Sequence, residues 1–130
     1  MQTNPPELRF GPKIIDFPDG DEKIDLDSVP PLILDKSTRG TDIGVDVSNA
    51  DLDTLDGDPR LAPLPSSGSE PSEAECVKAV ETNGTYNVDL TKGTRYCAVS
   101  GEGRTTYLRA VAVPTEGTIR LEVTVWEIPG

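Results

Sequence analysis

Acidic side chains are the residues of this sequence best suited to bind a cation. They cluster at Asp19–Glu22, Asp25–Asp27, Asp51–Asp53 and Asp56–Asp58. Calcium takes about six to eight oxygen ligands in irregular geometry, which acidic loops can supply. Asn49, Asp51 and Asp53 have the spacing that opens an EF-hand loop. Thr54 and Arg60 then stand where that loop requires glycine and a bidentate glutamate. The three residues are weak metal candidates, and we expect solvated acidic loops with no cofactor.

The sequence offers few residues that could form a catalytic site. Histidine is absent, which removes the commonest general base and the commonest metal ligand. Asp27-Ser-Val and Asp53-Thr-Leu resemble aspartic-protease turns but lack their glycine. Gly101-x-Gly103 falls short of a nucleotide fingerprint because Thr106 replaces the third glycine. We therefore expect a protein that is not an enzyme and has no catalytic residues.

Cys76 and Cys97 are the two cysteines, one in a predicted helix and one in a predicted strand. A bond between them would close a loop of about 20 residues and, in the chain-entropy model, add about 3 kcal/mol of stability. Two buried free thiols in a cytosolic protein are an equal alternative. The residues by themselves leave both open.

The candidate ligand face lies on one side of the predicted final hairpin. It consists of Tyr107, Arg109, Glu122, Thr124 and Trp126. Aromatic rings that stack on sugars, flanked by polar groups that bond the hydroxyls, suit a neutral polysaccharide. In the alternative, Trp126, the single tryptophan, packs under the acidic N-terminal segment as a second small core.

The hairpin that carries this face has a register set by its side chains. Pro114-Thr-Glu-Gly117 is typical of a four-residue turn and pairs Val113 with Thr118. The register then pairs Ala112 with Ile119 and Val111 with Arg120. The opposite, buried face collects the apolar residues Ile119, Leu121, Val123 and Val125, and a one-residue slip would expose them.

Other elements follow from local signals. Ser72 and Glu75 have the spacing of a capping box, so a helix of roughly two turns should begin there and end in a left-handed stop at Asn83-Gly84. After the helix the composition changes to Thr, Val, Tyr and Leu, which favours strands near 86–90, 95–99, 105–113 and 118–128. We expect the last three strands to form an antiparallel meander. Alternation predicts one clear strand at 42–47. The short apolar runs at 14–17, 24–26 and 32–34 indicate loops with a few edge strands.

Composition limits the architecture and the partners. The 130 residues fit one domain, and 12 prolines with 12 glycines exclude a helix bundle. We expect a flexible segment at 1–22 and a single domain at 23–130 with a mobile connector at 65–71. The fold should be all-β or β-rich: an antiparallel meander in a small sandwich or barrel, with one short helix. A net charge of −11 should repel nucleic acid, and no apolar run is long enough for membrane insertion.

Seven short motifs occur in a characteristic order. They are Asp25-Leu-Asp-Ser28, Gly40-Thr-Asp-Ile43, Ala62-Pro-Leu64, Cys76, Gly93-Thr-Arg-Tyr-Cys-Ala-Val99, Gly103-Arg104 and Val123-Thr-Val-Trp126. Together they resemble a small extracellular domain of actinobacteria. Such domains occur at the outer end of membrane-anchored serine/threonine kinases and in related secreted proteins of Streptomyces type. The resemblance covers about residues 23–127.

This resemblance implies a location, a crosslink and a role. It implies an extracellular or cell-surface setting, a bridge between Cys76 and Cys97, and a mostly β accessory or ligand-sensing module without catalytic residues. A kinase domain, a signal peptide and an anchor are missing, so we expect a fragment or a free-standing copy. A cell-wall polymer or an envelope protein is the expected partner. The alternatives are a carbohydrate- or peptidoglycan-binding module and a calcium-stabilised structural domain.

Overall fold

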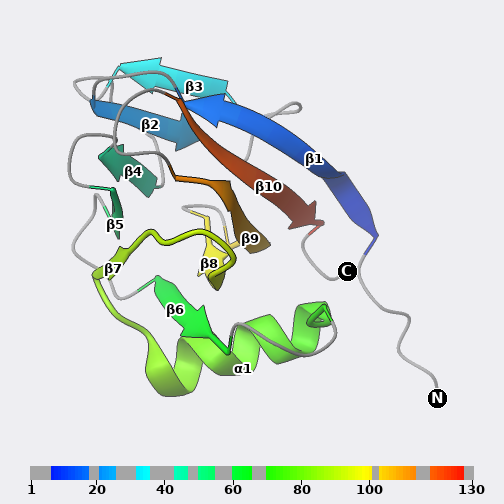
Figure 1. Ribbon diagram of the computed structural model, residues 1–130. Coiled ribbons are helices and arrows are strands. Elements are labelled where there is room, and N and C mark those ends of the chain that lie inside the picture. The colour runs from blue at the N-terminus through cyan, green and yellow to red at the C-terminus, as the bar shows by residue number, and fades with distance from the viewer. Residues whose placement is uncertain are drawn as a thin grey trace, which may run out of the picture.

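The computed structural model describes residues 7–17, 21–25, 32–35, 43–46, 50–54, 60–65, 70–100, 103–113 and 118–127. They form two antiparallel sheets and one helix (Figure 1), as the sequence predicts for a β-rich domain. Sheet A has the strand order β1 (Leu8–Phe17), β10 (Ile119–Trp126), β9 (Thr105–Ala112), β8 (Arg95–Val99) and β6 (Leu61–Leu64). Sheet B has the order β3 (Leu32–Asp35), β2 (Asp21–Asp25), β4 (Ile43–Asp46), β5 (Asp51–Thr54) and β7 (Asn87–Asp89). The helix is α1 (Glu73–Asn83).

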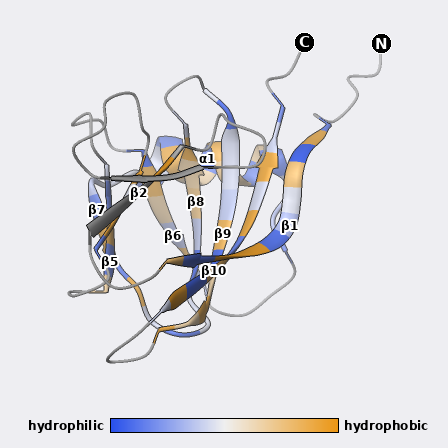
Figure 2. Cartoon of the chain, turned by 90° about the horizontal axis from the view of Figure 1, so that it is seen from above, coloured by the Kyte–Doolittle hydropathy of each residue, from blue (hydrophilic) through white to orange (hydrophobic). Residues whose placement is uncertain are grey.

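The core lies between the two sheets. Side chains alternate across each strand, so every second residue points inward, and Figure 2 shows this alternation of hydrophobic and hydrophilic positions along β1 and β10. The largest fully buried side chains come from both sheets: Phe17, Tyr96, Leu61, Leu108, Ile119, Leu121 and Val123 from sheet A, and Ile24, Ile43, Val45 and Leu52 from sheet B. The sheets also meet at one edge, where Leu61 and Thr85 exchange two backbone hydrogen bonds of 3.2 and 2.7 Å. The sandwich is therefore partly closed on that side.

The predicted meander is present, and its register is confirmed over most of its length. Val125 lies opposite Thr106, Val123 opposite Leu108, and Leu121 opposite Ala110. Near the turn the prediction is wrong, because the register shifts between Arg120 and Leu121 and places Ala112, not Val111, opposite Arg120. The extra residue is a β-bulge. Ile119 lies opposite Phe17 of β1 instead, and both side chains are fully buried.

The N-terminal boundary of the domain needs correction. Residues 1–22 were expected to lie outside the fold, yet β1 pairs along its length with β10 and forms the edge of sheet A. Phe17 is fully buried, and Phe10 and Ile15 pack against the core. The apolar run at 14–17 was read as a short edge strand. Its extension to Leu8 was missed because Gly11 and Pro12 interrupt the pattern.

The first half of the chain is richer in strands than the sequence indicates. β2, β3 and β4 fall on the predicted short runs, whereas β5 occupies a segment expected to be an acidic loop. β5 is held on both sides, because Leu52 lies opposite Val45 of β4 and Val88 of β7. Pro63 is accommodated because β6 is the edge of sheet A. Residues 66–69 of the expected connector, together with 1–6 and 18–20, lie outside the described residues.

Helix α1 begins where the capping box predicts. The Ser72 hydroxyl accepts the backbone N–H of Glu75 at 3.2 Å, and the Glu75 carboxylate accepts the backbone N–H of Ser72 at 3.0 Å. Hydrogen bonds to the Glu75 carboxylate from the Ser72 backbone N–H and then from the Ser72 side chain lower the pKa of Glu75, because they favour its charged form. The helix ends at Asn83, but Gly84 has φ −59° and ψ 139°, so the expected left-handed stop is wrong. An extended Gly84 leads the chain directly to the bridge at Thr85.

Candidate functional site

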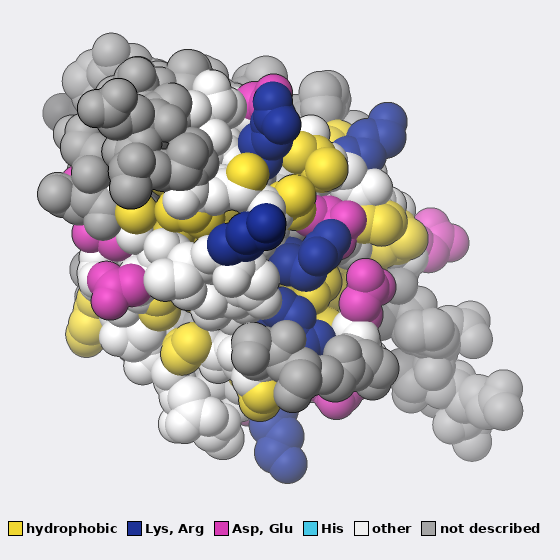
Figure 3. Space-filling model, viewed as in Figure 1, with side chains coloured by type: hydrophobic (Ala, Val, Ile, Leu, Met, Phe, Trp, Pro, Cys, Tyr) yellow, Lys and Arg dark blue, Asp and Glu magenta, His cyan; other side chains and the backbone are white. Residues whose placement is uncertain are grey.

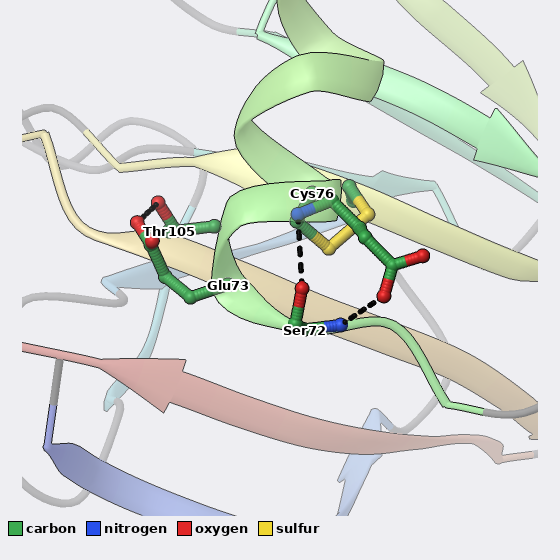
Figure 4. The surroundings of a disulfide bond; sticks show 6 residues. Ser72, Glu73, Cys76 and Thr105 are labelled. Atoms are coloured by element: carbon green, nitrogen blue, oxygen red, sulfur yellow. Dashed lines mark hydrogen bonds between the residues drawn. A yellow bond between two sulfur atoms is a disulfide. The ribbon is translucent and has the colours of Figure 1, made fainter. Parts of the chain in front are cut away.

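Helix α1 covers one end of the outer face of sheet A. The disulfide between Cys76 of α1 and Cys97 of β8 joins helix and sheet, with an S–S distance of 2.09 Å and both residues fully buried (Figure 4). The Thr105 hydroxyl donates to the Glu73 carboxylate at 2.9 Å and forms a second link. Around the disulfide lies a small apolar cluster, the helix cluster, made of Cys76, Cys97, Tyr107, Leu64, Ala79, Val80 and Trp126. The predicted bridge is confirmed, and a structural disulfide is typical of oxidising, non-cytoplasmic compartments.

Part of the candidate ligand face is buried near helix α1, and the rest lies beyond the helix. Tyr107 is 2% exposed and Thr124 is 6% exposed, so neither can present a surface to a polysaccharide. Trp126 is partly buried and packs on the helix cluster. A shared aromatic platform of Tyr107 and Trp126 is therefore absent. The alternative, a second small core, describes these residues better, but α1 takes the covering role expected of the acidic N-terminal segment.

Two buried tyrosines differ in how their hydroxyls are satisfied. The Tyr96 hydroxyl donates to the backbone carbonyl of Asp89. The Tyr107 hydroxyl has no hydrogen-bond partner within the described part of the chain. Tyr96→Phe should therefore lower the free energy of unfolding by about 1 kcal/mol, whereas Tyr107→Phe should leave it unchanged or raise it by up to about 1 kcal/mol. Urea unfolding of both variants measures the difference, and equal losses would contradict this assignment.

Tyr96 also makes the free energy of unfolding depend on pH in the alkaline range. Burial raises the pKa of Tyr96, against the opposing effect of the side-chain hydrogen bond with Thr94. The unfolded chain then releases the Tyr96 proton at lower pH than the folded one, so stability should fall as pH rises through 10. Tyr96→Phe should show a shallower decline than the parent protein.

Beyond the helix, the outer face of sheet A is open and charged. Arg109 of β9 lies opposite Glu122 of β10, and Glu122 lies opposite Ile14 of β1. One strand further along this row, Arg95 of β8 lies opposite Arg109. We call the accessible part of this surface the open face. It consists of Ile14, Asp16, Arg109, Arg120 and Glu122.

Arg109 of the open face and its neighbour Arg95 have different hydrogen-bond partners. Arg109 donates from Nε to Glu122 at 3.3 Å, and its side chain is 43% exposed. The hydrogen bond and the charge of Glu122 raise the pKa of Arg109, so its guanidinium stays charged. Arg95 is 7% exposed, and its Nε donates to the Pro65 carbonyl at 2.8 Å. Arg95 therefore adds a buried positive charge directly beside Arg109.

The open face ends in a depression next to the β9–β10 turn. This cavity has a volume of about 530 Å³ and is lined by Lys92, Ala112, Val113, Thr118 and Arg120. Arg120 pairs through Nε with Asp16 of β1 at 3.2 Å, and both side chains are more than half exposed. Sequence reasoning missed these residues. Alternation along β10 places Arg120 on the same side as Glu122, but a sequence pattern gives no distance to Lys92 or Asp16.

Aspartates of β4, β5 and β7 lie on the outer face of sheet B. Asp46 of β4 lies opposite Asp51 of β5, and Asp51 lies opposite Asp89 of β7. Asp53 shares this side of β5, because Leu52 between them points into the core. Two of the three weak metal candidates are thus brought to one face, while Asn49 lies outside the described residues. No group of three or more Cys, Asp or Glu side chains within the described ranges could hold a metal ion.

Comparison with protein-family models, with curated proteins and with solved structures finds no match to this chain. Among the described residues, no helix is long and apolar enough to cross a membrane.

Proposed function

We propose that this protein is a non-catalytic binding or sensing module that works outside the cytoplasm and takes an anionic ligand on its open face. In the setting implied by the family resemblance, it is an accessory domain of an actinobacterial cell-envelope or secreted protein. Its partner is then an acidic wall polymer or an acidic envelope protein.

The separation of charge between the two outer faces carries this proposal. Sheet B bears the row of Asp46, Asp51 and Asp89. Sheet A bears Arg95, Arg109 and Arg120, with Lys92 at its rim. Among the described residues, Asp16 pairs with Arg120, and Glu122 and Glu70 act on Arg109. These four cations lie on or beside one surface in a chain that has 23 acidic and 12 basic residues. Figure 3 shows Lys and Arg side chains gathered in a band over β10 and β9.

The overall charge of −11 is compatible with binding an anion at this place. At physiological ionic strength the Debye length is about 8 Å, so exposed charges on the far side of the sandwich are largely screened. The stacked sheets alone are about 10 Å apart. An anion on the open face therefore experiences mainly the nearby charges, which are Arg109, Arg120 and Lys92 together with the paired carboxylates Glu122 and Asp16. A nucleic-acid duplex is excluded from the proposal, because it would extend beyond this face toward acidic regions.

Two observations support a role in recognition outside the cytoplasm. The Cys76–Cys97 bridge is buried and structural, as expected in an oxidising compartment. Arg109 of β9 and exposed Ile14 of β1 lie in one row across sheet A, with Glu122 of β10 between them. A neutral carbohydrate is a weaker ligand class because Tyr107 is buried. Calcium stabilisation has less support, because the described acidic residues form no metal-binding group.

Binding to charged polymers tests the proposal. Affinity gel electrophoresis should show retardation by polygalacturonate, a carboxylate polymer, and none by dextran. Arg109→Gln should weaken binding by about three- to tenfold, since a charge-assisted hydrogen bond contributes about 1 kcal/mol or more. Lys78→Gln is the matched control, because it makes the same charge change at an exposed position of α1. Absence of retardation of the parent protein, or equal weakening by Lys78→Gln, would refute the proposal.

A further inference from the structure

The depression at the end of the open face has the composition of a site for a single anionic group. Among the five described residues that line it, Lys92 and Arg120 are cations and Thr118 carries a hydroxyl. Lys92 comes from the turn before β8, whereas Arg120 comes from β10. The fold thus brings together two positive charges that are 28 positions apart in the sequence.

Arg120 is oriented by its salt bridge with Asp16. The bridge joins Arg120 Nε to Asp16 Oδ1 at 3.2 Å, and 55% of the Arg120 side chain is exposed. Both partners have side chains that are more than half exposed, so this is a surface salt bridge. Such a bridge contributes at most about 1 kcal/mol to stability. An incoming oxyanion can therefore share or replace Asp16 at low cost. Asp16 is therefore a competitor of the ligand for Arg120.

The remaining wall of the depression is apolar. Ala112 and Val113 are partly buried and form this side, and the β-bulge at Val111 places Ala112 opposite Arg120. A volume of about 530 Å³ lies within the range of small-ligand pockets, about 300–1,000 Å³, and exceeds what a bare ion needs. The site therefore fits an anionic group together with the carbon skeleton that carries it.

We propose that this depression binds one phosphate or carboxylate group carried on a small polyol or sugar unit. Arg120 and Lys92 contact the anionic oxygens, the Thr118 hydroxyl donates to them, and Ala112 and Val113 pack against the carbon skeleton. This inference rests on the proposed function, because it locates the anchoring contact of an acidic polymer at the end of the open face. Both anionic groups offer the same chemistry to a guanidinium and an ammonium.

Titration of the full chain with small anions, followed by the backbone amide signals in NMR spectra, tests this site. Glycerol phosphate and glucuronate are the probes, with glycerol and glucose as neutral controls. The amides of Ala112, Val113 and Thr118 should shift with the anions and not with the controls. The probe that saturates at the lower concentration identifies phosphate or carboxylate as the source of the anion.

Three variants decide the role of the lining residues. Lys92→Gln combined with Arg120→Gln should raise the apparent Kd at least about tenfold, because it removes both positive charges that contact the anion. Asp16→Asn should lower the Kd by about two- to fivefold, because it removes the competing carboxylate and its exposed salt bridge. Lys78→Gln should leave the Kd unchanged. Opposite effects of the first two variants cannot arise from general loss of folding.

The outcomes separate this inference from the proposed function. If the protein binds polygalacturonate in an Arg109-dependent way but small anions do not shift the three amides, the depression is not the anchor and the proposed function stands. An unchanged Kd in the Lys92 and Arg120 double variant would also overturn the inference. If the parent protein binds neither the polymer nor the small anions, both fail.

Discussion

Replacing Cys76 and Cys97 together by alanine is expected to lower the free energy of unfolding by about 3 kcal/mol or more. The disulfide links residues 21 positions apart, and its removal restores the chain entropy of a loop of about 20 residues to the unfolded state. Both side chains are fully buried, so the substitution also leaves unfilled volume in the helix cluster. A domain of this size has about 5–15 kcal/mol in total, so the loss would be a large fraction.

Unfolding of the double cysteine variant should begin at α1. An isolated helix of 11 residues is marginal in water, and this one is held by the disulfide, its capping box, the Glu73–Thr105 hydrogen bond and the helix cluster. Without the disulfide the helix should separate from sheet A at lower urea concentration than the rest of the fold unfolds. Trp126 then becomes exposed, and its fluorescence should shift to the red before the main transition.

A cap variant is the control for this prediction. Ser72→Ala removes the capping hydroxyl and should lower the free energy of unfolding by about 1 kcal/mol, while the disulfide stays intact. It should therefore give one cooperative transition with a modest shift of its midpoint. If the double cysteine variant unfolds like the parent protein, the disulfide does not hold the helix to the sheet.

Features governed by nearby residues could be predicted from the sequence. The capping box at Ser72 and Glu75 depends on two side chains and the backbone between them, so it was recognisable without tertiary information. The register of β9 with β10 was correct from Thr106 to Ala110, because any slip would expose a continuous apolar row. It failed at Val111, where the β-bulge adds one residue to β9 without changing the alternation of apolar residues along β10.

Features governed by distant residues could not be predicted. β5 is a strand only because β4 and β7 provide partners for both of its edges, which no local pattern of four residues reveals. The aromatic residues of the hairpin were placed on the correct side of the sheet. Which element covers Tyr107 was decided by the disulfide that positions α1 there. The sequence therefore predicts on which side of the sheet these aromatic residues lie, but not which element packs over them.

The candidate site was predicted only in part. Arg109 and Glu122 were expected on one face and do form an ion pair there. Arg120 was excluded from the core by the register argument, yet its contact with Asp16 requires β1 beside β10. The N-terminal segment had been placed outside the domain, so neither Asp16 nor the depression could be inferred.

Gly11→Ala is expected to destabilise the fold by about 3–5 kcal/mol, because this residue sets how closely β1 approaches β10. A Cβ atom on Gly11 would lie 2.1 Å from the backbone oxygen of Val123, a contact that only a shift of the backbone can relieve. Gly11 also has φ +86°, a conformation that costs other residues about 1–2 kcal/mol. It lies between Phe10 and Lys13, where the register of β1 shifts.

The expected consequence is separation of the first part of β1 from β10. Phe10 would lose its packing on the core, and the backbone groups of Val123 would lose their partner strand. Urea unfolding should show a lower midpoint, and amide hydrogen exchange should increase at Val123 and Val125 more than at Leu108 in the centre of sheet A.

Gly93→Ala separates the effect of the contact from that of the conformation. Gly93 has φ +88°, nearly the same as Gly11, but a Cβ atom there would meet nothing within 4 Å. Its substitution should therefore cost only the conformational part, about 1–2 kcal/mol. Both substitutions also reduce the entropy of the unfolded chain, an effect that acts in the same direction in the two variants. The difference between the variants measures the close approach of β1 to Val123. Equal losses would mean that β1 can move away from β10 without cost, and that the N-terminal strand contributes little to the stability of sheet A.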